Sequence, residues 1–153
     1  MLALTKKSEY ALVAACHMAR LGERVVSARE IAEQQDVPLP LLMNVLKKLN
    51  QAGQIRSVRG ARGGYSLCVP PAELSLAAII EAVEGPVHLV SCVAGASNAR
   101  RVCPRMAKCA LRRPVRKIHD RLMEFLMNVT VADLAFDADY GERRGAGEKA
   151  MAQ

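Results

Sequence analysis

A mainly α-helical fold with one small β-hairpin is predicted by three features of this 153-residue sequence. Aromatic residues make up only 3% of the chain and Trp is absent, so the core must be built mainly from Leu, Ala, Val and Met, as in helical proteins. Apolar residues recur at helical spacing in several segments. Between these segments, residues 54–67 form two short strand-like runs around a glycine-rich turn, which is typical of a hairpin.

Three helices are expected before this hairpin. The first covers residues 4–21, where apolar side chains recur on one face. The second begins after Ser27, whose hydroxyl is placed to cap it, and runs to about Gln35. The third follows a tight turn and runs to about Ala52, where Gly53 ends it. Two short helices joined by such a turn form a helix-turn-helix unit.

The third helix is predicted to have one apolar and one polar face. Its apolar face consists of Leu42, Val45, Leu46 and Leu49. Its polar face consists of Asn44, Lys47, Lys48 and Gln51. A helix that only supports a fold usually mixes acids and bases on its polar face, whereas this face has hydrogen-bond donors and no acid. Such a face suits the major groove of DNA, so we expect this to be a recognition helix.

The hairpin that follows is predicted to be a wing. Its glycines permit positive φ at the turn, but a structural turn does not need the two arginines that accompany them, Arg59 and Arg62. These arginines would reach DNA phosphates or the minor groove. The predicted fold is therefore a winged helix-turn-helix. The candidate DNA contacts are Ser27, Asn44, Lys47, Lys48, Gln51, Arg59 and Arg62.

The net charge of +7 favours a polyanionic partner, because the basic residues are clustered. Residues 1–67 hold ten Lys or Arg against five acids, and residues 92–117 hold eight bases and no acid. No apolar run is long enough to cross a membrane and no signal peptide is recognisable, so we expect a cytoplasmic protein that does not bind membranes. No nucleophile–base constellation, Walker loop or dinucleotide fingerprint points to an enzyme.

The second half of the chain is predicted to mediate dimerisation. A fourth helix is expected over residues 75–84 and a long helix from Pro114 to about Ala135. Apolar residues of the long helix alternate in steps of three and four, as in a dimer seam, which is formed by Val115, Ile118, Leu122, Phe125 and Val129. The predicted organisation is a DNA-binding domain (1–90), a cysteine-bearing loop (91–113), a dimerisation helix (114–136) and a disordered tail (137–153).

Three of the five cysteines, Cys92, Cys103 and Cys109, lie within one acid-free loop, whereas Cys16 and Cys68 are expected to be small buried residues. Disulfides are not expected in a cytosolic protein, and three thiolates suit an iron–sulfur cluster or zinc. Their spacing alone leaves four alternatives: a cluster, zinc, redox-active thiols or simple packing. The side chains that could supply a fourth ligand are Glu9, His17, His88 and His119.

Four segments resemble the winged-helix regulators of the Rrf2 family, which includes IscR, NsrR and RirA. They are LTKKSEYAL (4–12), SAREIA (27–32), LKKLNQAG (46–53) and, most specifically, SVRGARGGYSL (57–67). The resemblance implies a homodimeric transcription factor, often a repressor, that binds a palindromic operator. It also implies that Cys92, Cys103 and Cys109 hold a 2Fe–2S or 4Fe–4S cluster.

The resemblance further implies that Glu9 of the partner subunit completes the cluster site, as an acidic residue does in nitric-oxide-sensing members. Arg112, and not a histidine, stands three residues after the last cysteine, which favours Glu9. The resemblance thus implies a repressor that senses iron or cluster supply, redox state or nitric oxide. The alternative is a regulator of the same fold without a cluster, in which the cysteines are thiol redox sensors or structural.

Overall fold

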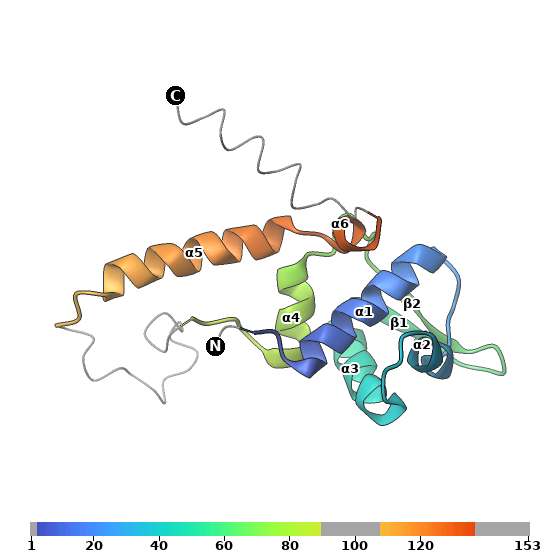
Figure 1. The fold of residues 1–153 in the computed structure, drawn as a ribbon. Coiled ribbons are helices and arrows are strands. Elements are labelled where there is room, and N and C mark those ends of the chain that lie inside the picture. The colour runs from blue at the N-terminus through green and yellow to red at the C-terminus, as the bar shows by residue number, and fades with distance from the viewer. Residues whose placement is uncertain (1–2, 90–107, 137–153) are drawn as a thin grey trace.

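The computed structural model describes residues 3–89 and 108–136 (Figure 1). It is mainly helical with one two-stranded antiparallel sheet, as predicted. In chain order the elements are α1 (Lys6–Leu21), α2 (Ala28–Gln34), α3 (Leu39–Gln51), β1 (Ile55–Val58), β2 (Gly64–Leu67), α4 (Leu76–Glu84), α5 (Arg112–Asn128) and α6 (Val131–Phe136). None of the helices within these ranges is long and apolar enough to span a membrane.

Helix α1 lies at the centre of the fold and contacts α3, α4, α6 and β2. Its buried side includes Ala11, Ala14, Ala15 and Met18. Small alanine side chains allow neighbouring helices to approach closely, and the buried methionine fills the remaining space. This single core holds the helix-turn-helix and the hairpin in a fixed relation, which is what a recognition surface needs.

The helix boundaries follow the capping signals of the sequence. The Ser27 hydroxyl accepts a hydrogen bond of 3.1 Å from the Glu30 backbone N–H and caps α2, as predicted. Helix α3 ends at Gln51 with Ala52 as its C-cap, and Gly53 follows with a φ of +72°, a left-handed conformation that glycine adopts without strain.

The predicted helix from Pro114 to about Ala135 is instead two helices. Helix α5 ends at Asn128, and Val129 is extended, with φ −83° and ψ 126°. The Val129 carbonyl accepts a hydrogen bond from the Leu76 N–H, and the Val131 N–H donates to the Leu74 carbonyl, both at 2.8 Å. These bonds tie the turn to the start of α4.

This break corrects two sequence predictions. Val129 is 2% exposed within its own chain, so its assignment to a dimer seam is wrong. The final helix α6 packs against α1, so residues 131–136 belong to the core around α1 and not to the predicted dimerisation helix. The cysteine-bearing loop is also shorter than predicted at its end, because α5 begins at Arg112.

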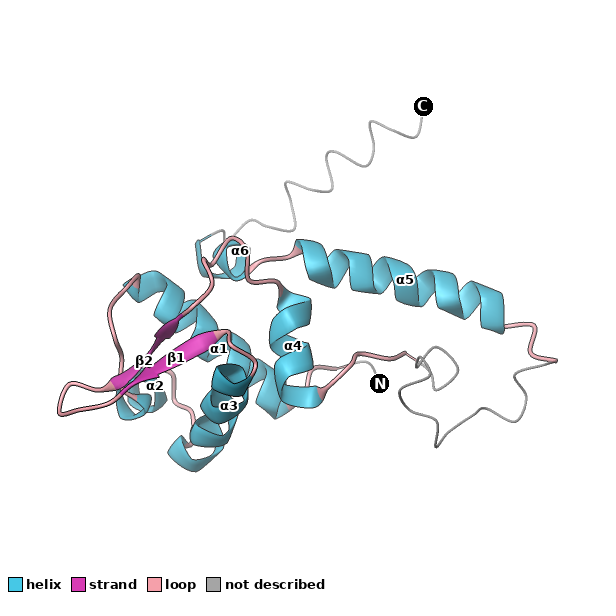
Figure 2. Cartoon of the chain, turned by 180° about the vertical axis from the view of Figure 1, so that it is seen from behind, coloured by secondary structure: helices cyan, strands magenta, loops and turns pink. Residues whose placement is uncertain are grey.

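The helices packed around the common core, α1–α4 and α6, form the body of the protein. The hairpin and the far end of α5 project from this body in opposite directions (Figures 1 and 2). Within the body, α4 contacts α1 and α3, and it also packs against α5. The predicted disordered tail, residues 137–153, lies outside the described residues.

Candidate nucleic-acid interface and metal-ligating residues

Helix α3 has the two faces that the sequence predicts. Its apolar face is buried in the core and consists of Leu42, Val45, Leu46 and Leu49. Its polar face is exposed and includes Asn44, Lys47, Lys48 and Gln51. The helix therefore presents hydrogen-bond donors to solvent from a backbone that its buried side holds in place.

The two neighbouring lysines of this face are not equivalent. The Lys48 ammonium donates a hydrogen bond to the Val83 carbonyl, in the last turn of α4. A cation at a helix C-terminus is favourable, because the helix dipole and the last free carbonyls are negative there. Lys47 has no hydrogen bond or ion pair to any residue that the structure describes. Lys47 is thus the cation of α3 that is free to meet a phosphate.

A backbone bridge attaches the wing to the segment before α2, in addition to the contacts of β1 with α3 and of β2 with α1. Tyr65, on β2, exchanges two backbone hydrogen bonds with Val26, of 2.8 and 2.9 Å. A Cβ on Gly64 would lie 2.3 Å from the Val26 carbonyl oxygen, so only glycine permits this close approach. Sequence reasoning explained the glycines by the turn alone and missed this contact, which holds the hairpin against the helix-turn-helix.

The tip of the wing carries the two predicted arginines, Arg59 and Arg62, and both are exposed. Gly60, with a φ of +119°, and Gly63 close the turn through a backbone hydrogen bond of 2.9 Å. Arg56 is a further exposed cation of the wing that the sequence reading did not single out. Its guanidinium donates to the Ser66 hydroxyl at 2.9 Å.

The recognition helix and wing together form an acid-free segment. No Asp or Glu occurs between Asp36 and Glu73. The same segment contains five cations: Lys47, Lys48, Arg56, Arg59 and Arg62. A surface of one sign attracts a polyanion over a distance of about 10 Å at ordinary ionic strength. This arrangement can bind the phosphates of a duplex while α3 enters its major groove.

Of the three predicted cysteine ligands, the structure describes Cys109, a free, half-buried thiol just before α5. Cys92 and Cys103 lie outside the described residues. Among the described residues no three His, Cys, Asp or Glu side chains converge on a possible metal site. The soft sulfur donor of Cys109 fits an iron–sulfur cluster chemically.

The two cysteines outside the triad differ from each other. Cys16 is half-buried in α1, and this burial raises the pKa of its thiol, which makes it a poor nucleophile. Cys68 is exposed, so its predicted burial is wrong. It directly follows the wing strand β2 and lies outside the core.

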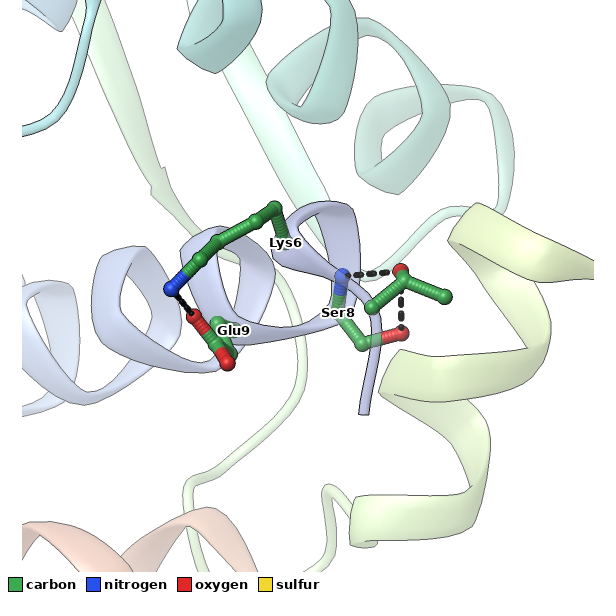
Figure 3. A network of polar contacts seen from close by, with 4 residues as sticks. Lys6, Ser8 and Glu9 are labelled. Carbon is green, nitrogen blue, oxygen red and sulfur yellow. Dashed lines mark hydrogen bonds and ion pairs between the residues drawn. The ribbon is translucent and has the colours of Figure 1, made fainter. Parts of the chain in front are cut away.

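Glu9, the predicted partner-subunit ligand, lies in the first turn of α1 with its side chain partly exposed (Figure 3). Its carboxylate pairs with Lys6 at 2.5 Å. On the other side of the same turn, the Ser8 backbone N–H donates to the Thr5 hydroxyl, which caps the helix. Among the described residues, the Glu9 carboxylate is held by this exposed ion pair alone, and breaking such a pair costs little free energy.

The three histidines fall into two groups. His17 is buried, and its Nδ1 lies 3.1 Å from the Gln35 amide nitrogen, which joins α1 to the end of α2. Burial lowers the pKa of His17 and so favours the neutral ring. His88 and His119 lie side by side, with ring centroids 6.3 Å apart. The Nδ1 atom of each is buried and has no hydrogen-bond partner among the described residues.

Helix α5 has no buried residue, although four of its five predicted seam positions lie within it. Leu111, Ile118 and Phe125 follow one another at seven-residue spacing and are all exposed, Ile118 by 59%. Val115 and Leu122 are half-buried beside them.

A cleft of about 410 Å³ lies between α5, the end of α4 and the N-terminal segment. Its lining is mostly apolar and includes Leu4, Ile80, Val87, Leu89, Leu122 and Leu126.

Comparison with known proteins finds similarity to bacterial transcriptional regulators. The Rrf2 family, described as "Iron-dependent Transcriptional regulator", matches residues 4–137. The transcriptional regulator IscR of Cereibacter sphaeroides is 39% identical over 62% of this chain, and the match spans 63% of that relative's length. The structure of CymR, the global cysteine regulator of B. subtilis, has a TM-score of 0.70 and 29% identity, covering 88% of this chain and 97% of CymR. The IscR structure from T. potens has a TM-score of 0.67 and 28% identity, covering 99% and 93%.

Proposed function

Because the chain belongs to the Rrf2 family of DNA-binding transcriptional regulators, we propose that it is a cytoplasmic homodimeric repressor whose operator affinity depends on an iron–sulfur cluster. The observation that carries the DNA-binding part is the acid-free surface formed by α3 and the wing. Both elements are fixed to one core, α3 by its buried apolar face and the wing by the Val26–Tyr65 pairing.

In this proposal α3 lies in the major groove of a palindromic operator and the wing follows the flanking backbone. Asn44 and Gln51 offer side chains that can read base edges, and Lys47 offers an unoccupied cation for phosphate. Arg59 and Arg62 contact phosphates or the minor groove. Ser27 and Lys48 act differently from the other candidates, because the Ser27 hydroxyl already caps α2 and Lys48 is bonded to α4.

Dimerisation is proposed to occur through α5. Ile118 and Phe125 are both more than half exposed, and an exposed stripe of large apolar side chains marks a protein–protein contact. The seven-residue spacing is that of a helix pair related by two-fold symmetry. A two-fold dimer places two recognition helices on two half-sites of a palindrome.

The cluster is proposed to be held by Cys92, Cys103 and Cys109. Their thiolates are soft donors, and the segment around them is basic, which offsets the negative charge of a thiolate-bound cluster. When bound, such a cluster supplies a cross-link that oxidation, nitric oxide or iron shortage can remove. Glu9 of the partner subunit is proposed as the fourth ligand, and its exposed position is compatible with that role.

Helix α4 provides a route from this segment to the DNA. The segment that leads to Cys92 follows directly from the last turn of α4, and that turn accepts the hydrogen bond from Lys48 of α3. Helix α4 also contacts α5. A change in the conformation of the cysteine segment on cluster loss would thus move both the recognition helix α3 and the dimer helix α5. This would shift the spacing of the two α3 helices in the dimer.

The test combines optical and binding measurements on the anaerobically purified full chain. We expect an iron–sulfur absorption spectrum with matching iron and sulfide content, lost in Cys103→Ala. Cys68→Ala removes an exposed thiol outside the triad and serves as the matched control. Affinity for a duplex selected from random-sequence DNA should differ before and after cluster removal by a chelator. Equal affinities would contradict cluster control, and a colourless wild-type protein that binds DNA would favour the alternative without a cluster, in which the cysteines are thiol redox sensors or structural.

The fourth ligand is tested separately with Glu9→Ala. This variant should retain iron but show a shifted spectrum and faster cluster loss in air, because one ligand is replaced by solvent. His88→Ala and His119→Ala are the comparison, since these two rings lie together with unpartnered nitrogens. A spectrum changed by a histidine variant and not by Glu9→Ala would overturn the assignment of Glu9.

A further inference from the structure

We propose that Met43 reads the C5-methyl groups of thymines in the operator and is a specificity-determining residue of α3. The inference rests on the proposed placement of α3 in a major groove. Met43 is 45% exposed. The large apolar side chains of α3 other than Met43, Leu41 and Leu39 are buried in the core. On a helix that lies in a major groove, an exposed apolar side chain such as Met43 is placed to contact an apolar group of the bases.

Helical geometry places Met43 beside the free cation of α3. Successive residues of an α-helix are about 100° apart, so Met43 lies about 40° from Lys47 around the axis and one turn before it. Met43 is also in the first half of α3, which begins at Leu39. The N-terminal half of a recognition helix is the part that contacts base edges.

Leu41 is equally exposed, at 48%, but lies on the opposite flank of α3. It lies about 20° around the axis from Lys48 and two turns before it. Lys48 is bonded to the last turn of α4, so this flank faces the protein's own body. Of the two exposed apolar side chains, Met43 is therefore the one on the flank that leads away from α4.

The chemistry of the groove selects thymine as the base that Met43 would contact. Thymine alone presents a methyl group on the major-groove floor, where the other bases present donors and acceptors. The flexible, polarisable methionine side chain adapts its shape to such a group. Lys47 beside it, and the absence of acids between Asp36 and Glu73, favour DNA over a basic or neutral partner for this flank.

The experiment removes single methyl groups from the DNA. Duplexes that the full chain enriches from random-sequence DNA are remade with deoxyuridine in place of one thymidine at a time, which leaves base pairing unchanged. We expect one or two positions in each half-site at which this change weakens binding about three- to fivefold, as burial of one methyl group predicts. Met43→Ala should bind the thymidine and deoxyuridine duplexes equally, and Leu41→Ala should keep the difference.

The comparison across variants separates contact from DNA shape, because an effect of the methyl group on duplex shape would persist in Met43→Ala. Two results would overturn the inference: no position sensitive to deoxyuridine, or the same sensitivity in Met43→Ala as in the wild type. Loss of the difference in Leu41→Ala alone would assign the contact to the other flank and reject Met43. Failure to enrich any duplex would instead reject the proposed DNA-binding function. Circular dichroism checks that both variants fold.

Discussion

The hydroxyl of Thr5 donates a hydrogen bond of 2.5 Å to the carboxylate of Glu84, 79 positions later in the chain. Thr5 is the N-cap of α1 and Glu84 is the last residue of α4. One side chain therefore caps the central helix and joins its start to the end of the helix from which the cysteine segment departs.

We expect Thr5→Ala to lower the free energy of unfolding by about 1–2 kcal/mol, because it removes the cap of α1 together with the bond to Glu84. Thr5→Ser keeps a hydroxyl at the same place and should lose less than half as much. Urea denaturation followed by circular dichroism measures both changes. Equal losses in the two variants would mean that the methyl group, and not the hydroxyl, is responsible.

Lys47→Ala should weaken DNA binding and reduce the slope of log affinity against log salt by about one, as the loss of one phosphate contact does. Lys48→Ala is the matched control, since its ammonium is already bonded to the Val83 carbonyl. Its salt slope should stay near that of the wild type. Fluorescence anisotropy at several salt concentrations measures both. Arg62→Ala, at the tip of the wing, should behave like Lys47→Ala.

Gly64→Ala should destabilise the protein by at least about 2 kcal/mol, because the new methyl group would collide with backbone that cannot move aside easily. The atom it meets is the Val26 carbonyl oxygen, 2.3 Å away. Ala61→Ser, at the exposed tip of the same hairpin, should have little effect. Thermal unfolding gives the comparison, and an unchanged melting temperature for Gly64→Ala would show that the wing is not held at this point.

Ile118→Asp should convert the dimer to a monomer and abolish operator binding. Ile118 is 59% exposed, so the change spares the chain's own core, whereas Leu122 also lines the cleft beside α4. Met127 is 56% exposed on the opposite side of α5, and Met127→Asp is therefore the control of equal exposure. Analytical ultracentrifugation gives the mass of each variant. A dimeric Ile118→Asp protein would place the interface elsewhere.

The stability of the protein should fall as pH falls below about 6.5, in part because of His17. Burial lowers the pKa of His17, so the unfolded chain binds a proton more readily than the native protein below the ordinary value of 6.5. The contribution of neutral, buried His17 to the free energy of unfolding is therefore complete above pH 6.5 and is lost as the pH falls and the ring binds a proton. The unfolding free energy of His17→Gln, measured from pH 7.5 to 5.5, should depend less steeply on pH. Identical slopes would assign the effect to other groups.

Much of the fold could be predicted from local signals in the sequence. Ser27 and Gly53 mark helix ends by side-chain chemistry and backbone freedom that act within a few residues, so no long-range information was needed. The two faces of α3 were equally readable, since burial follows the helical period. These are properties of a segment and not of its partners.

The remaining features depend on contacts between distant residues. The apolar spacing of the dimerisation helix continues through Val129, which hid the break before Thr130. A capping signal was present there, because Thr130 and Asp133 exchange hydrogen bonds of 2.8 and 3.2 Å at the start of α6. The partner of Lys48 lies 35 positions away, and the approach of His88 to His119 also requires the folded chain.

In the proposed dimer, the turn after α5 would fix the distance between the two recognition helices. Two backbone hydrogen bonds, to Leu74 and Leu76, fasten the C-terminal end of α5 to the body that carries α3. A helix of 17 residues extends about 25 Å from that anchor, so where two copies cross along it sets the distance between their recognition helices. The operator half-sites must match that distance, about 34 Å for one turn of DNA. Adding or removing residues in α5 would consequently change which spacing of half-sites is bound, without altering any residue that touches DNA.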